Sequence, residues 1–327
     1  MAAERRKDLG LASDPYHAIL FPGQGAQRVG MGRELAKACP EARAIFERAN
    51  DALGFDLAAL CFEGPAEELN RTSICQPAIL ATSMAALEAW RSRGGDPEPV
   101  PSAGLSLGEY TALVYAGAIT LDDAVPLVHL RGQLMEEAGR ENPGTMVAVL
   151  GLDRERVNDL LEAAGEHGAA QVANLNAPGQ IVVSGSVPAM DWAMKHAKDF
   201  GADRGIRLRV SAAFHSRLMA GAAERLGRAL GKVAISQPRS PVVSNVTAKF
   251  IGTAAEIRGL LVNQLTSPVL WEDSMRFLLA SGLRRFVEVG PGTVLAGLLR
   301  RIDPTLEAVS LRTPADLDAL ESEDPPE

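Results

Sequence analysis

Three short apolar segments in the sequence each end at a glycine-rich turn, and each is followed by apolar residues at helical spacing. The first is His17–Phe21, which meets the turn Pro22–Gly25. The second covers residues 99–104 and leads into an amphipathic run over Glu109–Ala118, and the third is Arg285–Val289. A strand that breaks sharply into a helix is the repeating unit of a parallel sheet covered by helices. The pattern therefore predicts an α/β core with a parallel sheet.

A different pattern fills residues 139–208. Strands and helices are expected there in the order strand, helix, strand, strand, helix, strand: Gly144–Leu150, Arg154–Ala164, Val172–Asn176, Gln180–Ser184, Val187–Phe200 and Ile206–Val210. This order is typical of a split βαβ, or ferredoxin-like, unit. We therefore expect a large subdomain formed by residues 16–138 and 209–313, into which a ferredoxin-like small subdomain of residues 139–208 is inserted.

The two ends of the chain are polar. We expect residues 1–15 to form a disordered extension and residues 314–327 to form an acidic tail, whose last part, Glu321–Glu327, is expected to be disordered. The start of the chain mixes acidic with basic residues and has no apolar centre. No later stretch reaches about 18 uninterrupted apolar residues. The sequence therefore predicts neither a targeting segment nor a membrane-spanning one.

The charge and the cysteines narrow the possible functions. With 33 Lys and Arg against 41 Asp and Glu, the formal net charge is −8, which argues against nucleic acid or an anionic membrane as the main partner. Cys39, Cys61 and Cys75 form no C-x-x-C pair and have no histidine at ligand spacing, so neither a disulfide framework nor a metal site is predicted. We expect a cytoplasmic protein that acts on a small molecule.

Gly104–Gly108 has the pattern G-x-S-x-G, in which a serine on a tight strand-to-helix turn presents its hydroxyl to a cleft. The segment lies at the end of an expected strand and opens a helix, which is the context that the motif requires. It also places the backbone N–H of Leu107 at a helix N-terminus. Ser106 is therefore the candidate nucleophile, with an inert helix-capping serine as the alternative. The turn makes the expected core α/β-hydrolase-like.

A serine hydroxyl needs a base, and His215 is the best candidate among five histidines. It stands in a loop after an expected strand and is flanked by small residues. The alternative interpretation is that His215 is a buried structural histidine. The other four histidines have ordinary positions in a strand, in helices or in a loop: His17, His129, His167 and His196. No residue stands out as the acid of a catalytic triad.

Two further features suggest substrate contacts. Arg131 lies among apolar residues of an expected helix, so it is either an arginine that reaches the surface or a guanidinium that holds a carboxylate in the cleft. The second role would select a dicarboxylic acyl group. The turn Phe21–Gln27 does not fit a phosphate-binding loop, because Met31 stands where the lysine is required. Such a turn can instead aim backbone N–H groups at an oxyanion.

Taken together, these segments resemble the malonyl-CoA:acyl carrier protein transacylase family over about residues 16–313. The motifs that carry the resemblance occur in the family's order: Phe21–Gln27, Gly104–Tyr110, Leu130–Gly132, Asn174–Gln180, Phe214–Ser216, Val243–Val246, Gln264 and Glu288–Gly292. The resemblance implies that Ser106 is acylated and that His215 is its base. The backbone N–H groups of Gln24 and Leu107 would form the oxyanion hole, and Arg131 would bind the malonyl carboxylate.

The resemblance also implies that a main-chain carbonyl orients the histidine, and the matching position is Gln264. Asn174 or Asn176 would line the site, and we take Asn176 as the substrate-binding candidate. Phe214, beside the candidate base, resembles the residue at this position in family members selective for malonyl. A bulky ring there disfavours an acyl group with an α-methyl branch. Leu105 departs from the histidine that the family commonly has before the serine. Any substrate contact made by that histidine is therefore in question here.

The implied activity is transfer of a malonyl group from coenzyme A, through a serine ester, to the phosphopantetheine thiol of an acyl carrier protein, for fatty-acid or polyketide biosynthesis. Malonyl-CoA and acyl carrier protein are the expected partners, with no cofactor, no metal, no nucleic acid and no membrane, and we expect a monomer. A serine hydrolase such as a thioesterase is the main alternative, and a catalytically silent or nucleotide-binding α/β protein is a more distant one. Basic residues that could dock an acidic carrier are Lys195, Lys198, Arg204, Arg207, Arg284, Arg285, Arg300 and Arg301.

Overall fold

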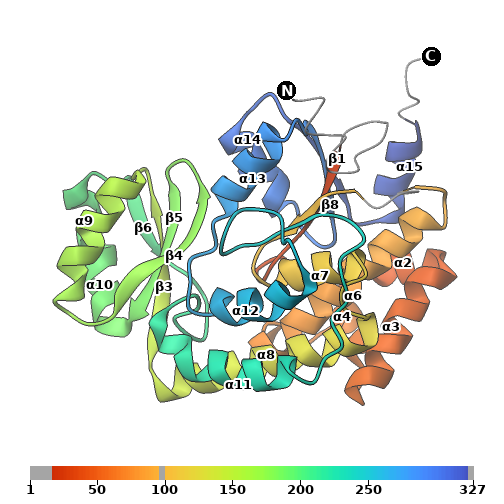
Figure 1. The fold of residues 1–327 in the computed structure, drawn as a ribbon, viewed down its shortest axis with the longest axis horizontal. Helices are drawn as coiled ribbons and strands as arrows, with labels where there is room; N and C mark the ends of the chain where they lie inside the picture. Colours follow the sequence, from red (N-terminus) through yellow and green to blue (C-terminus); the bar gives the residue numbers. More distant parts are fainter. Residues whose placement is uncertain (1–16, 96–99, 323–327) are drawn as a thin grey trace.

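The computed structural model describes residues 17–95 and 100–322, which form a large α/β lobe with a small lobe beside it (Figure 1). The expected N-terminal extension, residues 1–15, and the end of the expected tail, residues 323–327, lie outside the described residues. The large lobe contains a parallel sheet and the small lobe an antiparallel one. The expected parallel α/β core with an inserted small lobe is confirmed.

Five parallel strands form the sheet of the large lobe, in the order β7-β2-β1-β8-β9. They are β1 (His17–Phe21), β2 (Ser102–Gly104), β7 (Val242–Val243), β8 (Arg285–Val289) and β9 (Glu307–Leu311). Side chains of β1 alternate between two apolar cores: Ile19 and Phe21 belong to one, and Ala18 and Leu20 to the other. Because successive side chains of a strand point to opposite faces, both faces of this sheet are covered.

The helices of the large lobe provide that cover, and none of the helices in the described ranges is both long and apolar enough to cross a membrane. They are α2 (Arg33–Ala38), α3 (Pro40–Leu53), α4 (Leu57–Glu63), α5 (Ala66–Leu69), α6 (Thr72–Arg91), α7 (Leu107–Tyr115), α8 (Leu121–Glu141), α11 (Ala220–Leu230), α12 (Ala254–Gln264), α13 (Trp271–Ala280), α14 (Val294–Ile302) and α15 (Pro314–Ser322), with a short turn η2 at Arg217–Met219.

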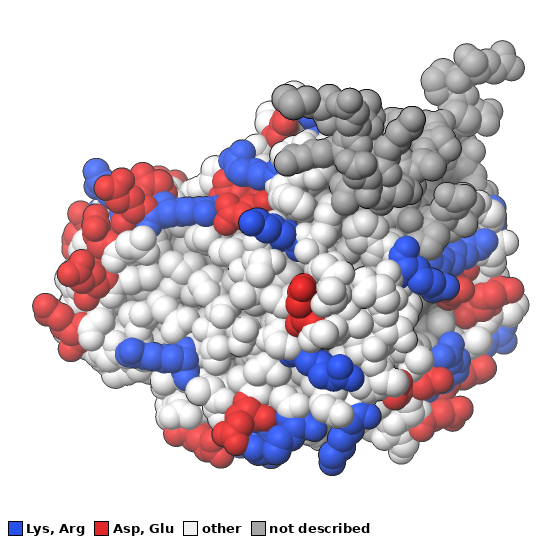
Figure 2. Space-filling model, in the orientation of Figure 1, with Lys and Arg blue, Asp and Glu red and all other residues white. Residues whose placement is uncertain are grey.

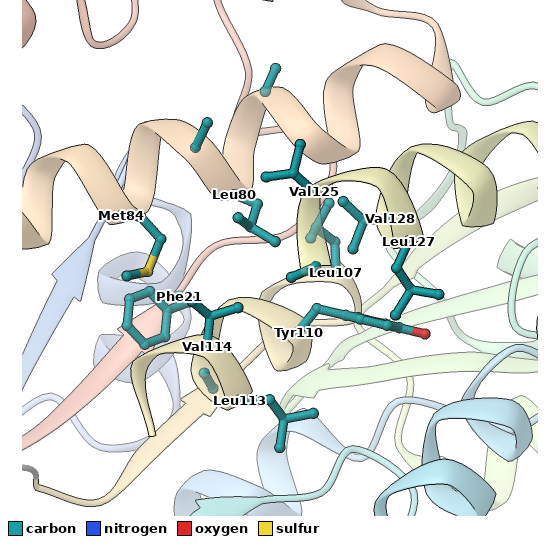
Figure 3. Close-up of a cluster of buried hydrophobic side chains, with 14 of the residues drawn as sticks. Phe21, Leu80, Met84, Leu107, Tyr110, Leu113, Val114, Val125, Leu127 and Val128 are labelled. Atoms are coloured by element: carbon teal, nitrogen blue, oxygen red, sulfur yellow. The ribbon is translucent and has the colours of Figure 1, made fainter. Parts of the chain in front are cut away.

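Helix α7 follows the serine turn directly, and every one of its residues is buried. Figure 3 shows Leu107 and Tyr110 of this helix among apolar side chains from β1, α6 and α8. The expectation of an amphipathic helix over Glu109–Ala118 is therefore wrong, because neighbouring elements surround α7. Full burial of one leucine side chain contributes about 1.5–3 kcal/mol. The helix that carries the serine turn is thus held firmly by its packing.

The register of β1 and β2 places two turns side by side. Phe21 pairs with Gly104, so both strands end at the same level, and the turns that follow leave the sheet together. Two glycines allow this close approach: a Cβ at Gly23 would lie 2.3 Å from the carbonyl oxygen of Leu105, and a Cβ at Gly108 would lie 2.1 Å from that of Phe21. Neither distance is possible for a side chain, so both turns require glycine.

The small lobe has the expected ferredoxin-like order of elements. Its sheet has the order β4-β5-β3-β6 with antiparallel pairs, and its elements are β3 (Gly144–Leu150), α9 (Arg154–Gly165), β4 (Ala170–Ala177), β5 (Gln180–Ser186), α10 (Val187–His196), η1 (Ala197–Phe200) and β6 (Arg204–Arg207). Val147 and Val149 belong to the lobe's own core, whereas Met146 and Val182 belong to the core of the large lobe. The sheet is therefore a layer between its own helices and the large lobe.

Three boundaries differ from the sequence-based expectation. Helix α8 continues to Glu141, so the small lobe begins after residue 139, and its last strand is Arg204–Arg207 rather than Ile206–Val210. The expected acidic tail begins with helix α15, whose Leu317 is buried and whose Asp318 pairs with an arginine at 2.5 Å. The helix contacts α2 and β9. The prediction of a tail rested on the acidic composition of residues 314–327, which does not indicate that this helix has a buried apolar side.

The contact between α6 and α8 gives a stability prediction. A Cβ at Gly132 of α8 would lie 2.5 Å from the Cα of Ser73 and from the carbonyl oxygen of Thr72. We expect Gly132→Ala to lower the free energy of unfolding by about 2–3 kcal/mol, because the two helices must separate. Urea denaturation followed by circular dichroism measures this change.

The matched control is Gly259→Ala in α12, where a Cβ would meet nothing within 4 Å. Since the helix gains from the better propensity of alanine, we expect this variant to be more stable by about 0.5–1 kcal/mol. Equal urea midpoints for the two variants would contradict the proposed steric origin.

Candidate active site

Ser106 is the residue at which strand β2 turns into helix α7. Its backbone has φ 55° and ψ −100°, a conformation that costs a non-glycine residue on the order of 1–3 kcal/mol. The side chain of Asn245 compensates, because its Oδ1 accepts from the backbone N–H of Ser106 at 2.7 Å and its Nδ2 donates to the carbonyl of Gly104 at 2.7 Å. Gly104 must be glycine here, since a Cβ would lie 1.9 Å from the backbone of Gly108.

The structure brings His215 onto Ser106. The hydroxyl oxygen of Ser106 and Nε2 of His215 are 2.8 Å apart, and Nδ1 of His215 is 2.7 Å from the main-chain carbonyl of Gln264. A carbonyl can only accept, so Nδ1 carries the proton and Nε2 is free to accept one from the serine. Gln264 is the last residue of α12, where helix carbonyls lack partners within the helix. This explains why its carbonyl is available to the histidine.

Arg131 is buried beside the serine, with 1% of its surface exposed. The interpretation of a surface arginine is therefore wrong. Its Nη1 donates to Oε1 of Gln76 at 2.7 Å, and its Nη2 donates to the Ser106 hydroxyl at 3.1 Å and to Oε1 of Gln264 at 2.9 Å. The guanidinium carbon lies 5.3 Å from the centre of the Tyr110 ring, which adds a cation–π contact. A positive charge is thus fixed next to the nucleophile.

The sequence analysis missed Glu109, which is buried within the same network. Its Oε2 accepts from Nε2 of Gln264 at 2.5 Å and from the backbone N–H of Asn245 at 3.3 Å. Its position one helical turn after the serine of the G-x-S-x-G pattern was visible in the sequence, but nothing there indicated that it points inward. Gln76, on α6, and the side chain of Asn245 were missed for the same reason.

Among the titratable groups of the site with displaced pKa values, His215 and Glu109 bear most directly on proton transfer. Burial lowers the pKa of His215 to about 4, and the charge of Arg131 adds to the lowering while the hydrogen bond to Gln264 opposes it. Burial raises the pKa of Glu109 to about 7, against the hydrogen bonds from Gln264 and Asn245 and the attraction of Arg131. At neutral pH the histidine is therefore in the form that accepts a proton.

The expected oxyanion donors lie at the two neighbouring turns. Leu107 is the first residue of α7, where backbone N–H groups have no partner within the helix. Within residues 17–95 and 100–322, neither the N–H of Leu107 nor that of Gln24 has a hydrogen-bond acceptor. The close approach of Gly23 to Leu105 brings the two turns together. Both donors are therefore free beside the serine turn.

The side chains of the other predicted substrate contacts make none of the hydrogen bonds recorded for this network in the described residues. Phe214 precedes the histidine and is buried in the core of the large lobe. Asn176 lies on β4, and its Oδ1 is buried without a hydrogen-bond partner among the described residues. Asn174 is on the same strand, next to Val269 of the large lobe. Leu105 packs against the second core of the large lobe.

The remaining histidines are engaged elsewhere. Nδ1 of His129 lies 2.7 Å from the carbonyl of Ser73, while His167 and His196 stack on Trp192. In the part of the chain that the structure describes, no group of three His, Cys, Asp or Glu side chains is placed to hold a metal ion. The three cysteines are unpaired.

Comparison with known proteins places this site in a family. Residues 19–310 match the family model for acyl transferase domains. The protein of Bacillus subtilis (strain 168) named malonyl CoA-acyl carrier protein transacylase is 44% identical over 302 residues, which is 92% of this chain and 95% of that protein. The protein of the same name from Salmonella typhimurium is 46% identical over 302 residues, with 92% and 97% covered.

A solved structure has the same fold along nearly the whole chain. It is described as a type II polyketide synthase acyl-carrier protein in complex with its malonyl-transacylase, and it matches with a TM-score of 0.91 and 42% sequence identity, covering 94% of this chain and 100% of the other. The family model and the two relatives each cover most of the chain. This chain therefore belongs to the malonyl-CoA:acyl carrier protein transacylase family of acyl transferases.

Proposed function

We propose that the protein transfers the malonyl group of malonyl-CoA, through an ester on Ser106, to the phosphopantetheine thiol of an acyl carrier protein. One observation carries the proposal: a serine in contact with a neutral histidine at 2.8 Å is also in contact with a fully buried guanidinium at 3.1 Å. The first contact suits nucleophilic attack on a thioester. The second suits a substrate whose acyl group ends in a carboxylate.

In the first half-reaction Ser106 attacks the thioester carbonyl while Nε2 of His215 takes the hydroxyl proton. The carbonyl oxygen becomes an oxyanion, which the N–H groups of Gln24 and Leu107 stabilise, each donor contributing about 3–4 kcal/mol. The tetrahedral intermediate then breaks its carbon–sulfur bond. The proton on His215 passes to the departing sulfur, and a malonyl ester on Ser106 remains.

In the second half-reaction the thiol of the carrier protein attacks the malonyl ester. His215 takes the thiol proton and returns it to the Ser106 oxygen as the ester bond breaks. Both halves use the same base and the same donors, and the malonyl thioester, the carrier thiol and the protein supply every reacting group. The proposed reaction therefore needs no cofactor, and its kinetics are ping-pong.

The surroundings of the histidine support transfer to a thiol over hydrolysis. A triad hydrolase has a carboxylate on the histidine nitrogen that faces away from the serine. Here that nitrogen bonds to the main-chain carbonyl of Gln264, and Glu109 instead accepts from the Gln264 side chain. We propose Phe214 and Asn176 as residues that shape the acyl and thioester subsites, because one lies next to the base and the other carries a buried free acceptor.

Docking of an acidic carrier would need a basic surface. Figure 2 shows Lys and Arg side chains scattered beside Asp and Glu on one face, not gathered in one patch. Arg284 and Arg285 stand where β8 begins, at the edge of the parallel sheet opposite to the serine turn. This leaves the candidates on α10, η1, β6 and α14: Lys195, Lys198, Arg204, Arg207, Arg300 and Arg301.

A monomer in the cytoplasm remains our proposal, and three unpaired cysteines are compatible with a reducing compartment.

Formation of the acyl-enzyme tests the proposed function. We expect intact-mass spectrometry after incubation with malonyl-CoA to detect a malonyl adduct on the wild-type protein, discharged by holo-carrier protein and only slowly by water. Ser106→Ala should form no adduct, because the nucleophile is gone. Rapid loss of the adduct in water without a carrier would support the hydrolase instead, and absence of both an adduct and released coenzyme A in the wild type would exclude both reactions.

Substitution of Arg131 tests the carboxylate contact. We expect Arg131→Ala to lower kcat/KM for malonyl-CoA by about a hundredfold or more, because a buried charge pair is lost. Acylation by acetyl-CoA, which has no carboxylate, should change by a few-fold at most. Arg131→Lys keeps the charge but not the paired N–H groups, so its loss should be intermediate. An unchanged preference for malonyl-CoA over acetyl-CoA in Arg131→Ala would rule out this role.

The displaced pKa of His215 predicts the pH profile. Because burial lowers this pKa to about 4, the base stays unprotonated as pH falls, and kcat/KM should decline only well below the ordinary histidine value of 6.5. Stopped-flow acylation between pH 4 and pH 8 measures the decline. Glu109→Gln is the control, since it removes a carboxyl that titrates near pH 7. A decline centred near 6.5 in both proteins would contradict the assignment.

A further inference from the structure

A cavity with a volume of about 320 Å³ lies where the small lobe joins the large one. Its charged lining consists of three arginines and one glutamate: Arg71, Arg140, Arg209 and Glu136. Arg140 is near the end of α8, and Arg209 follows β6, so the cavity spans the junction of the two lobes. We call it the arginine pocket. Its lining carries an excess of positive charge in a protein whose total charge is negative.

The positive charge of the arginine pocket is not neutralised from within. The guanidinium groups of Arg140 and Arg209 make no ion pair or hydrogen bond with any residue in the described ranges. Arg71 pairs with Glu68 at 3.0 Å, but both side chains are about half exposed, so that pair is weak. The carboxylate of Glu136 is engaged by the backbone N–H of Ser73 at 2.9 Å and by its hydroxyl at 3.1 Å. Unpaired guanidinium groups favour an anionic ligand.

The wall of the arginine pocket connects it to the active site. Gln24, whose N–H is a proposed oxyanion donor, lines the pocket, and its side chain donates to the hydroxyl of Thr72 at 3.4 Å. That hydroxyl is 3.1 Å from the hydroxyl of Ser211, and this contact connects helix α6 to the segment that follows β6. Thr72 lies one helical turn before Gln76, which holds Arg131. The lining of the arginine pocket is therefore linked, through Gln24 and Thr72, to groups of the candidate active site.

Helix α8 gives the separation of one arginine of each site along the helix axis. Arg131 and Arg140 both lie on this helix, and the nine-residue step between them corresponds to a rise of about 13.5 Å. A pantetheine arm has roughly twelve bonds between its sulfur and its phosphate oxygen, which equals about four residues of extended backbone, or about 14 Å. An arm with its thioester at Ser106 can therefore reach the pocket with its phosphate.

We propose that the arginine pocket binds the phosphate group at the far end of the pantetheine arm, with Arg140 and Arg209 as its main ligands. This inference rests on the proposed transfer from a coenzyme A thioester. Both coenzyme A and a loaded carrier protein carry a phosphate at this point, so the pocket would hold donor and acceptor arms in turn. Binding there adds affinity for the arm without contact to the reacting atoms.

Substrates of decreasing length test the proposal. The substrates to be compared are malonyl-CoA, malonyl-dephospho-CoA, malonyl-phosphopantetheine and malonyl-pantetheine. Only the last of them lacks the phosphate next to the arm. Arg140→Ala and Arg209→Ala should each raise KM about tenfold for the first three substrates, since a charge-assisted hydrogen bond is lost. Neither should change KM for malonyl-pantetheine, and kcat should stay within about twofold for all four. Arg228→Ala, an exposed arginine outside the pocket, is the matched control and should change nothing.

The outcomes separate the sources of the phosphate and the two proposals. A raised KM for holo-carrier protein in the same variants assigns the pocket to the acceptor arm as well, and an unchanged one restricts it to coenzyme A. An effect that disappears with dephospho-CoA, or one of equal size with malonyl-pantetheine, overturns the pocket. Failure of the proposed function itself is distinct, because then wild-type protein forms no malonyl adduct even from malonyl-pantetheine at high concentration. Melting curves of the variants exclude misfolding.

Discussion

The hydrogen bonds of Gln264 connect the serine, the histidine, the arginine and Glu109 of the candidate active site. Its main-chain carbonyl accepts from His215, its Oε1 accepts from Arg131, and its Nε2 donates to Glu109 and to the carbonyl of Ser106. The residue is fully buried, so water cannot replace any of these bonds. Each buried polar group left without a partner costs about 1–3 kcal/mol. One residue at the end of one helix thus positions Ser106, His215 and Arg131 together through its main chain and its side chain.

The fold explains how residues so distant in sequence meet there. Parallel strands that end at one level put the turn after β1 beside the serine turn after β2, and Asn245, which follows β7, closes the serine turn from the other side. Helix α12 then presents its last residue, with a free carbonyl, to the histidine. The apolar cores on both faces of the sheet hold these elements rigidly, which a site with tolerances of a few tenths of an ångström requires.

The sequence predicted correctly those features of the fold and of the candidate site that depend on short local patterns. The strand-to-helix turns, the G-x-S-x-G serine and the split βαβ order each combine a short motif with an expected element, and the structure has all three. Glu109, Gln76 and the Asn245 side chain could not be found in that way, because their inward direction depends on which helix packs on which. Helix α15 was not predicted for a related reason. Its Leu317 is buried, and the helix contacts α2 and β9, which are distant in the sequence.

The charge of Arg131 acts on the pKa values of both His215 and Glu109, and the two effects complement each other. Burial alone would make both the histidine and Glu109 neutral, since each loses the hydration that its charged form needs. Arg131 lowers the pKa of His215 further and opposes the rise in the pKa of Glu109, so its charge favours the unprotonated histidine and the ionised form of Glu109. The guanidinium that we propose as the ligand of the substrate carboxylate therefore also favours the form of the histidine that can accept a proton.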